Sequence, residues 1–275
     1  MPKTEDEWKV VADEFRRKWN FPHAIGAIDG KHVSIKKPPG SGSFYYNYKG
    51  FFSIVLMAVV NANYEFLMVD AGINGRVSDG GVISYSTFGR MMEQNKLCIP
   101  ASEKLHENDN ACLPFVFLAD DAFSLGENLM KPYGGEGAGK LDLSQCIYNY
   151  RVSRARRVVE NAFGILVSRF GVFERAIKLA PEKAKSITLA CCYLHNYLRK
   201  RSGSYVASGT VDWEDDNGVV HQGSWRESQR NLEGLRATYG RNASAQAKYY
   251  RDLYKEYFNS KGAVPWQKER CTWLN

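Results

Sequence analysis

A short, uninterrupted apolar run, Leu113–Ala119, constrains the fold of this chain more than any other segment. A run of this length without polar alternation is typical of a central strand that helices cover on both faces. Two carboxylates, Asp120 and Asp121, follow it directly. Because open α/β sheets bind ligands beyond the carboxyl ends of their strands, the run predicts a layered α/β fold with acidic side chains at the sheet edge.

Three further strands are expected upstream of this run. Residues Ala24–Ile35 are first apolar and then alternating, which predicts a strand with Asp29 in its middle or at a bend. Phe51–Val60 and Tyr64–Val69 are rich in β-branched and aromatic residues and are separated by a short turn-forming stretch, so they predict an antiparallel hairpin. The expected sheet is therefore mixed.

Helical periodicity of apolar residues marks the remaining elements. The first helix has Thr4 and Glu7 at the spacing of a capping box, and Ser78 or Asp79 is the natural N-cap of the second. The fourth predicted helix has its apolar face at Ile187, Ala190, Tyr193, Leu194 and Tyr197. The predicted helices span residues 5–19, 80–94, 152–173, 181–199 and 243–260.

Composition excludes some classes of protein. No apolar run approaches the roughly 18 residues that a membrane-spanning helix needs, and the N-terminus is too polar for a secretory signal, so an intracellular location is expected. The formal net charge of +7 is compatible with nucleic-acid binding but does not require it. The six cysteines lack zinc-site spacing and are expected to be free, and Cys191 and His195 are expected to pack on one helix face.

Several sequence blocks occur in a fixed order along the chain. The blocks are Ile28–Val33, Tyr46–Ser53, Val69–Gly80, Leu118–Asp120, Tyr148–Asn149, Arg154–Gly164 and Leu194–Asn196. Together they resemble the PIF/Harbinger transposases and the nucleases derived from them, over about residues 24–200. The resemblance implies an RNase-H-like, integrase-type fold and a metal-dependent DNA endonuclease.

The family's acidic triad falls on Asp29, Asp120 and Glu160, which the resemblance implies are the catalytic residues and metal ligands. A further recurrent family aspartate matches Asp79, expected as a fourth metal ligand. Such nucleases hold two hard cations about 3.5–4 Å apart with oxygen ligands, so Mg²⁺ or Mn²⁺ is the expected cofactor.

Each of these acidic residues also fits a structural role. Asp29 with Gly30 is a common turn pair, Asp79 is explained equally well as a helix N-cap, and Glu160 could pair with Arg156 and Arg157 on an exposed helix face. Asp121 should point away from Asp120 if the chain is still extended there. The surrounding motif blocks favour the catalytic interpretation for the triad.

Basic residues beside Glu160 are candidates for contacts with DNA phosphates. The predicted DNA-binding residues are Arg154, Arg156 and Arg157 on the long helix, and Lys49 after the first strand. Near Lys49, an aromatic loop at residues 44–48 could stack on a displaced strand or simply pack against the protein. His32 is expected to support the first strand rather than to act in catalysis.

The expected organisation is an N-terminal helix at 1–22, an RNase-H-like nuclease domain at 23–200, a flexible linker at 201–241 and a C-terminal helix and tail at 242–275. A second flexible stretch is expected in the Gly-rich segment 134–139. Full-length relatives carry an N-terminal helix-turn-helix-like region, whereas this chain starts 28 residues before Asp29, so a fragment or a truncated descendant is expected.

The resemblance implies DNA as substrate, a Myb-like companion protein, and a location in the nucleus and cytoplasm. One alternative is a catalytically silent, domesticated transposase that binds DNA or protein. Another is a glycoside hydrolase that uses two carboxylates without metal. The basic charge balance and the order of elements disfavour the second alternative.

Overall fold

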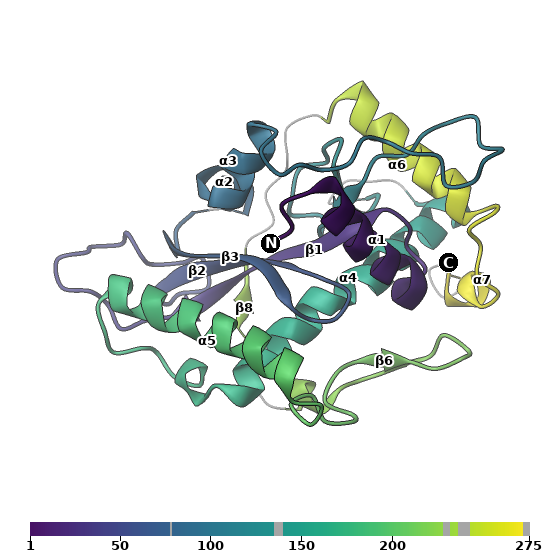
Figure 1. The fold of residues 1–275 in the computed structure, drawn as a ribbon. Coiled ribbons are helices and arrows are strands. Elements are labelled where there is room, and N and C mark those ends of the chain that lie inside the picture. The colour runs from purple at the N-terminus through teal and green to yellow at the C-terminus, as the bar shows by residue number, and fades with distance from the viewer. Residues whose placement is uncertain (78, 135–139, 228–231, 236–242, 272–275) are drawn as a thin grey trace.

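A mixed β-sheet organises the chain in the computed structural model, which describes residues 1–77, 79–134, 140–227, 232–235 and 243–271 (Figure 1). The strands lie in the order β3-β2-β1-β4-β5, with β8 also paired to β1. Strands β1, β2 and β3 are antiparallel, whereas β4 and β5 continue the sheet in parallel with β1. They are β1 (Ala24–Ser34), β2 (Ser53–Val60), β3 (Phe66–Asn74), β4 (Val116–Leu118), β5 (Leu129–Met130) and β8 (Glu233–Gly234). The predicted mixed sheet is confirmed.

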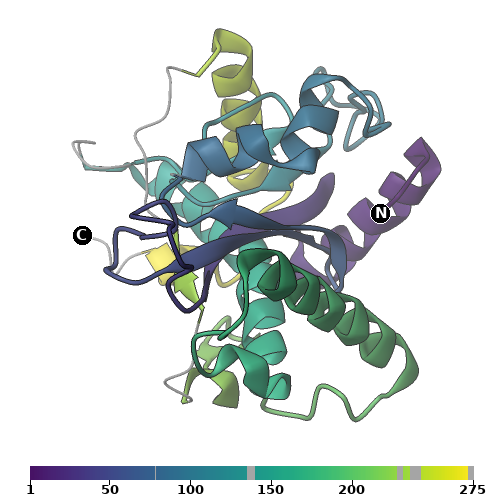
Figure 2. The same cartoon turned by 90° about the vertical axis from the view of Figure 1, so that its left-hand side faces the viewer.

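Helices cover both faces of this sheet, and two apolar cores lie between the layers. Figure 2 shows the sheet nearly edge-on, with α5 (Pro181–Arg201) beneath it and α2 (Asp79–Tyr85) and α3 (Thr87–Glu93) above it. The long helix α4 (Leu143–Arg169) shares the α5 side. In β4, Val116 and Leu118 belong to this core, whereas Phe117 belongs to the core on the other side. The apolar run 113–119 therefore contains a strand with apolar cores on both faces, as predicted.

The remaining helices close the ends of the layers. Helix α1 (Glu5–Trp19) begins at the predicted cap, where the Thr4 side chain accepts a hydrogen bond from the Glu7 amide. It spans both cores, since Trp8 packs in one and Phe15 in the other. Helix α6 (Ala245–Phe258) packs beside α4. The other short elements are α7 (Gln267–Cys271) and the 3-10 helix η1 (Gly171–Phe173).

Two of the predicted helices differ clearly from the structure, and the second of them, predicted to end at residue 173, ends at Arg169 before the separate 3-10 helix η1. The predicted helix 80–94 is two helices, because Ser86 turns its side chain to accept a hydrogen bond from the Gly89 amide and starts α3. Helix α4 begins at Leu143 instead of residue 152. Its true start is a capping box in which Asp142 and Gln145 satisfy each other's backbone amides, a local signal that the apolar periodicity did not reveal.

The prediction of which α5 residues form its buried face is wrong. Tyr193, Leu194 and Tyr197 are at least half exposed, and the buried face carries small and polar residues instead. His195 can be buried because its ring nitrogens bond to the Tyr64 carbonyl and the Tyr205 hydroxyl. The buried residues of α5 are Pro181, Ala184, Thr188, Cys191, Cys192 and His195.

The segment after α5 differs from the expected flexible linker over its described part. It forms a small hairpin of β6 (Trp213–Glu214) and β7 (Val220–His221), followed by the 3-10 helix η2 (Ser224–Arg226). Asp212 and Trp225 are buried there, at 1% and 7% exposure. The rest of the expected linker, 228–231 and 236–241, lies outside the described residues, as does most of the Gly-rich segment, 135–139.

All six cysteines are free, as predicted, and four of them are buried. Among the described residues, every helix is too short or too polar to cross a bilayer.

Candidate active site

Neighbouring parallel strands bring Asp29 and Asp120 to equivalent positions. Ala27 of β1 pairs with Leu118 of β4, and each aspartate lies two residues further along its own chain. Asp29 also pairs across the sheet with Ala58, which belongs to the α4-side core. Because side chains alternate along a strand, Asp29 faces α4, and Asp120 continues the same alternation from Leu118. The sheet register therefore places the two carboxylates side by side.

Glu160 lies on α4 and is linked to the two aspartates by Arg156, which is one turn earlier on the same helix and interacts with all three carboxylates. An Arg156 Nη2 nitrogen donates to Glu160 Oε1 at 2.7 Å. Burial lowers the pKa of Arg156, but the charges of Asp29, Glu160 and Asp120, in that order, outweigh it and leave this pKa above its ordinary value. Arg156 is thus the shared neighbour of all three predicted catalytic carboxylates.

Lys31 is a second cation among these carboxylates. Its Nζ lies 2.8 Å from Asp29 Oδ2, while Asp29 Oδ1 accepts a hydrogen bond from the Gly30 amide. Burial lowers the pKa of Lys31, yet its interactions with Asp29, together with the more distant charge of Glu160, leave this pKa raised. Sequence analysis did not single out Lys31, although its two-residue spacing from Asp29 on a strand puts both on one face.

The carboxyl group of Asp120 carries the clearest electrostatic signature of the site. Burial, followed by the negative charge of Asp29, raises the pKa of Asp120 to about 6, against the lowering effects of Arg156 and the Ala122 amide. Asp121 is exposed to solvent, which confirms that the adjacent aspartates point in different directions. Perturbed carboxyl groups of this kind concentrate at functional sites.

The chemistry of the donor atoms suits a hard divalent cation. Asp29, Asp120 and Glu160 offer oxygen ligands, and the charge of Asp29 contributes, after burial, to the raised pKa of Asp120. Within the described parts of the chain, however, no group of three or more acidic, histidine or cysteine residues is close enough to hold an ion. Lys31 and Arg156 neutralise the carboxylates in this conformation. Asp79 begins α2, but its side chain lies outside what the structure describes.

We expect Asp120→Asn to raise the stability of the metal-free protein relative to wild type as pH increases. The folded state retains a proton on Asp120 up to about pH 6, whereas the unfolded chain loses it near the ordinary value of 3.8. Stability from this group is therefore present below about pH 4 and is lost as pH rises through about 6, by up to about 1.4 kcal/mol per pH unit. Asparagine stays neutral, so the advantage of the variant should grow across this window.

The measurement is urea unfolding of both proteins in EDTA at several pH values between 4 and 7. A free-energy difference between variant and wild type that stays constant across this range would contradict the raised pKa of Asp120.

The residues predicted to contact DNA differ in their burial and in their ion-pair partners. Arg154 is buried, pairs with Glu214 and donates to the Trp19 carbonyl, so in this structure it is a structural residue and the prediction of a phosphate contact is corrected. The Arg157 side chain is only 12% exposed and also faces Glu214. Neither arginine could be recognised as buried from helix periodicity, because their partner lies 60 and 57 residues away.

Lys49 pairs with Glu233, a residue of β8, and its side chain is about one-third exposed. His32 is buried, bonds through Nδ1 to the Ser53 hydroxyl at 2.9 Å, and has its pKa lowered by burial to about 4. It is therefore neutral at physiological pH, in agreement with a supporting role in β1.

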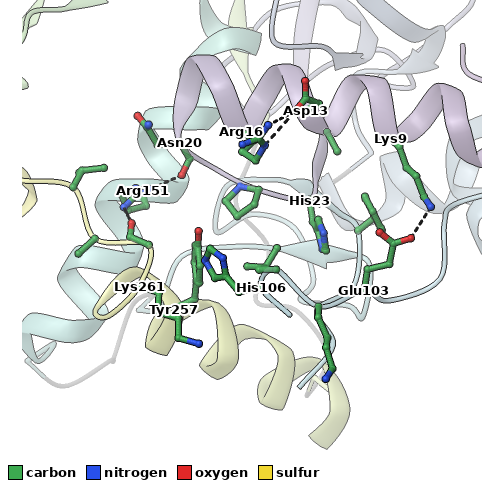
Figure 3. Close-up of a pocket in the computed structure, with 18 residues that line it drawn as sticks. Lys9, Asp13, Arg16, Asn20, His23, Glu103, His106, Arg151, Tyr257 and Lys261 are labelled. Atoms are coloured by element: carbon green, nitrogen blue, oxygen red, sulfur yellow. Dashed lines mark hydrogen bonds and ion pairs between the residues drawn. The ribbon is translucent and has the colours of Figure 1, made fainter. Parts of the chain in front are cut away.

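A separate cavity of about 600 Å³ lies between α1, the loop 103–106 and the C-terminal elements (Figure 3). Its walls are charged, but Lys9 pairs with Glu103 at 2.6 Å and Arg16 pairs with Asp13 at 2.6 Å. None of the predicted catalytic carboxylates lines it. The cavity is therefore separate from the predicted catalytic site.

A mixed α/β sheet flanked by helices, with one carboxylate on β1, one just beyond β4 and one on a long basic helix, fits the class of RNase-H-like nuclease domains. Residues 28–196 match the family described as DDE superfamily endonuclease, and the chain belongs to this family. Asp29, Asp120 and Glu160 all lie inside the matched range.

Curated relatives support the same assignment. The chain is 28% identical over 199 residues to "Putative nuclease HARBI1" of Homo sapiens, covering 71% of this chain and 52% of that protein. It is 26% identical over 227 residues to the Xenopus laevis protein of the same name, covering 80% and 59%. It is 29% identical over 199 residues to "Protein ALP1-like" of Arabidopsis thaliana, covering 70% and 48%. The chain thus spans about half the length of the curated relatives it matches. No solved structure matches it significantly.

Proposed function

We propose that this protein is a divalent-metal-dependent DNA endonuclease of the PIF/Harbinger type, which hydrolyses phosphodiester bonds. The observation that carries the proposal is the register of β1 and β4, which sets Asp29 and Asp120 side by side, facing Arg156 and, through it, Glu160. Family membership supports nuclease chemistry at this position.

The proposed mechanism assigns a role to each group of this site. Asp29, Asp120 and Glu160 would hold Mg²⁺ or Mn²⁺, which supplies activation of the attacking water and stabilisation of the leaving oxygen. We include Asp79 as a further ligand in this proposal. Lys31 and Arg156 hold the carboxylates in the absence of metal by neutralising their mutual repulsion. Once the carboxylates engage metal, these cations are in place to attract the DNA backbone.

DNA is the proposed substrate, and a Myb-like companion protein and residence in the nucleus and cytoplasm belong to the same proposal. Lys49 remains a proposed backbone contact, because its side chain is partly exposed beside the ring of Tyr48. Of the three predicted arginines of α4, we retain only Arg156 as a phosphate contact. Its guanidinium interacts with the predicted catalytic carboxylates, whereas the other two face Glu214.

A second candidate is a catalytically silent descendant that binds DNA or protein. The observation that favours it is the pairing of Asp29 with Lys31 and of Glu160 with Arg156, which satisfies both carboxylates without metal. Retention of every motif carboxylate favours the nuclease over this alternative. Family membership leaves the glycoside hydrolase without support.

The proposal is tested by nicking of supercoiled plasmid and of terminal-repeat DNA. We expect nicked product with Mg²⁺ or Mn²⁺ and none with EDTA, because oxygen ligands without a His/Cys cluster favour these ions over zinc. A Myb-like companion protein is added in a parallel series. Calorimetric titration of Mn²⁺ into the protein measures metal binding independently of turnover.

Nicking that survives EDTA would rule out the proposed site. Absence of nicking together with absence of Mn²⁺ binding, even with a competent companion, would replace the nuclease by the silent binding protein.

A further inference from the structure

The segment that follows α5 docks on α4 at the residue next to Glu160. Asn161 is completely buried, and its Nδ2 donates to the Asp212 carbonyl at 3.1 Å. Its Oδ1 accepts hydrogen bonds from the Asp212 amide at 2.9 Å and from Trp225 Nε1 at 3.0 Å. One side chain of the motif that carries Glu160 therefore fixes two points of a segment beyond the family match, which ends at residue 196.

Gly164, one turn after Glu160, completes the docking surface. A β-carbon at this position would lie 2.3 Å from the indole ring of Trp225, closer than any real contact. Only glycine lets the indole pack this closely against the helix. The motif Glu160–Gly164 thus combines a predicted catalytic carboxylate with a receptor for the downstream segment.

The docked segment holds Arg226 rigidly. Arg226 Nε lies 2.9 Å from both carboxylate oxygens of Asp212, and its Nη2 bonds to the same carboxylate. Asp212 is further fixed by the Gly223 amide at 2.8 Å, and the guanidinium lies 4.4 Å from the ring centroid of Trp225. A guanidinium held by a buried carboxylate and an aromatic ring is ordered before any ligand arrives.

The same arginine makes a second, weaker contact with Glu160. Arg226 Nη2 lies 3.3 Å from Glu160 Oε2, with side chains that are 34% and 30% exposed, whereas Glu160 Oε1 is bonded to Arg156. An exposed pair at this distance contributes little, while the buried bonds to Asp212 are strong. The contact with Glu160 is therefore the one that can be exchanged without displacing Arg226.

A cavity of about 190 Å³ lies beside this contact, and it is lined by Lys31, Glu160, Phe163, Gly164, Trp225, Arg226 and Leu232. Lys31 and Arg226 are the two cations of this lining and Glu160 is its carboxylate, while Lys31 also pairs with Asp29 and Arg226 with Asp212. Once a metal ion compensates the charge of Glu160, the two cations favour an anionic group in this space.

We propose that Arg226 is a substrate-binding residue that contacts a DNA phosphate beside the scissile bond. In the metal-free protein its Nη2 contacts Glu160 as well as Asp212, and when a metal ion compensates Glu160 this nitrogen contacts the phosphate instead of Glu160, while Nε keeps its bonds to Asp212. The inference rests on the proposed nuclease function and adds to it a residue from outside the family match.

The test is the salt dependence of duplex DNA binding, measured by fluorescence anisotropy in Ca²⁺ and in EDTA, with gels to confirm intact DNA. Arg226→Gln is compared with Arg90→Gln, which removes the same charge from an exposed position on α3. In Ca²⁺ we expect the slope of log K against log salt to be less steep by about 0.9 in Arg226→Gln than in Arg90→Gln. This difference is the value of one lost phosphate contact. In EDTA the two variants should agree.

Because Arg226→Gln leaves the buried charge of Asp212 unpaired, the double variant Asp212→Asn/Arg226→Gln repeats the measurement with both charges removed. Arg226→Lys should recover most of the slope in Ca²⁺, since one phosphate contact needs only one cation. Equal slopes for the double variant and Arg90→Gln in Ca²⁺, with wild type still nicking DNA, would overturn the inference alone. A wild-type protein that neither nicks nor binds DNA would overturn the proposed function and the inference with it.

Discussion

Replacement of Asp120 by Asn is expected to reduce metal-dependent nicking of DNA by about a thousand-fold or more. The carboxamide keeps the shape of the side chain but loses the charge that holds a divalent cation, whose contribution to phosphodiester cleavage is several kcal/mol. Burial, followed by the negative charge of Asp29, disfavours ionisation of Asp120, and a bound cation would compensate both effects. The measurements are the initial rate of plasmid nicking at saturating Mg²⁺ and calorimetric titration of Mn²⁺.

Asp121→Asn is the matched control, because it removes the same charge from the adjacent, exposed residue. Its nicking rate should stay within a few-fold of wild type. Equal losses in the two variants would point to a general effect of charge on DNA binding, and wild-type activity in Asp120→Asn would remove Asp120 from the catalytic site.

Asp212→Ala is expected to release the segment that carries Arg226, at a cost of about 3–5 kcal/mol in the stability of its docked state. The substitution leaves Arg226 without its buried partner and the Gly223 amide without its acceptor. Trp225 should then leave its position against Gly164. Amide hydrogen exchange of residues 205–226 measures the local opening, and limited proteolysis detects the same release.

Asp216→Ala is the control within the same segment, since it removes the same charge from an exposed residue of the outer hairpin. Its effect should be a few tenths of a kcal/mol. Exchange protection in Asp212→Ala that matches this control would show that the segment is held by other contacts than the Asp212–Arg226 pair.

Periodicity and local chemistry were sufficient to predict the four strands β1 to β4, but not the two-residue strands β5 and β8 or the extension of β3 from Val69 to Asn74. The uninterrupted run that contains Val116–Leu118 favoured a strand with apolar contacts on both faces, and the alternation after Asp29 favoured another strand. The convergence of Asp29 with Asp120 required a family resemblance, because parallel pairing joins residues that are 91 positions apart and no local pattern encodes that register.

The sequence by itself determined the longer helices and strands and which carboxylates belong to the family motif, because these properties depend on neighbouring residues. Only the tertiary structure decided which charged groups meet. It buried Arg154 against Glu214, turned the tyrosines of α5 to solvent, and packed a polar, Gly-rich segment against α4 so that Arg226 reaches Glu160. The physical reason is that a buried charge or histidine is stable only beside its partner, and the chain supplies these partners from distant positions.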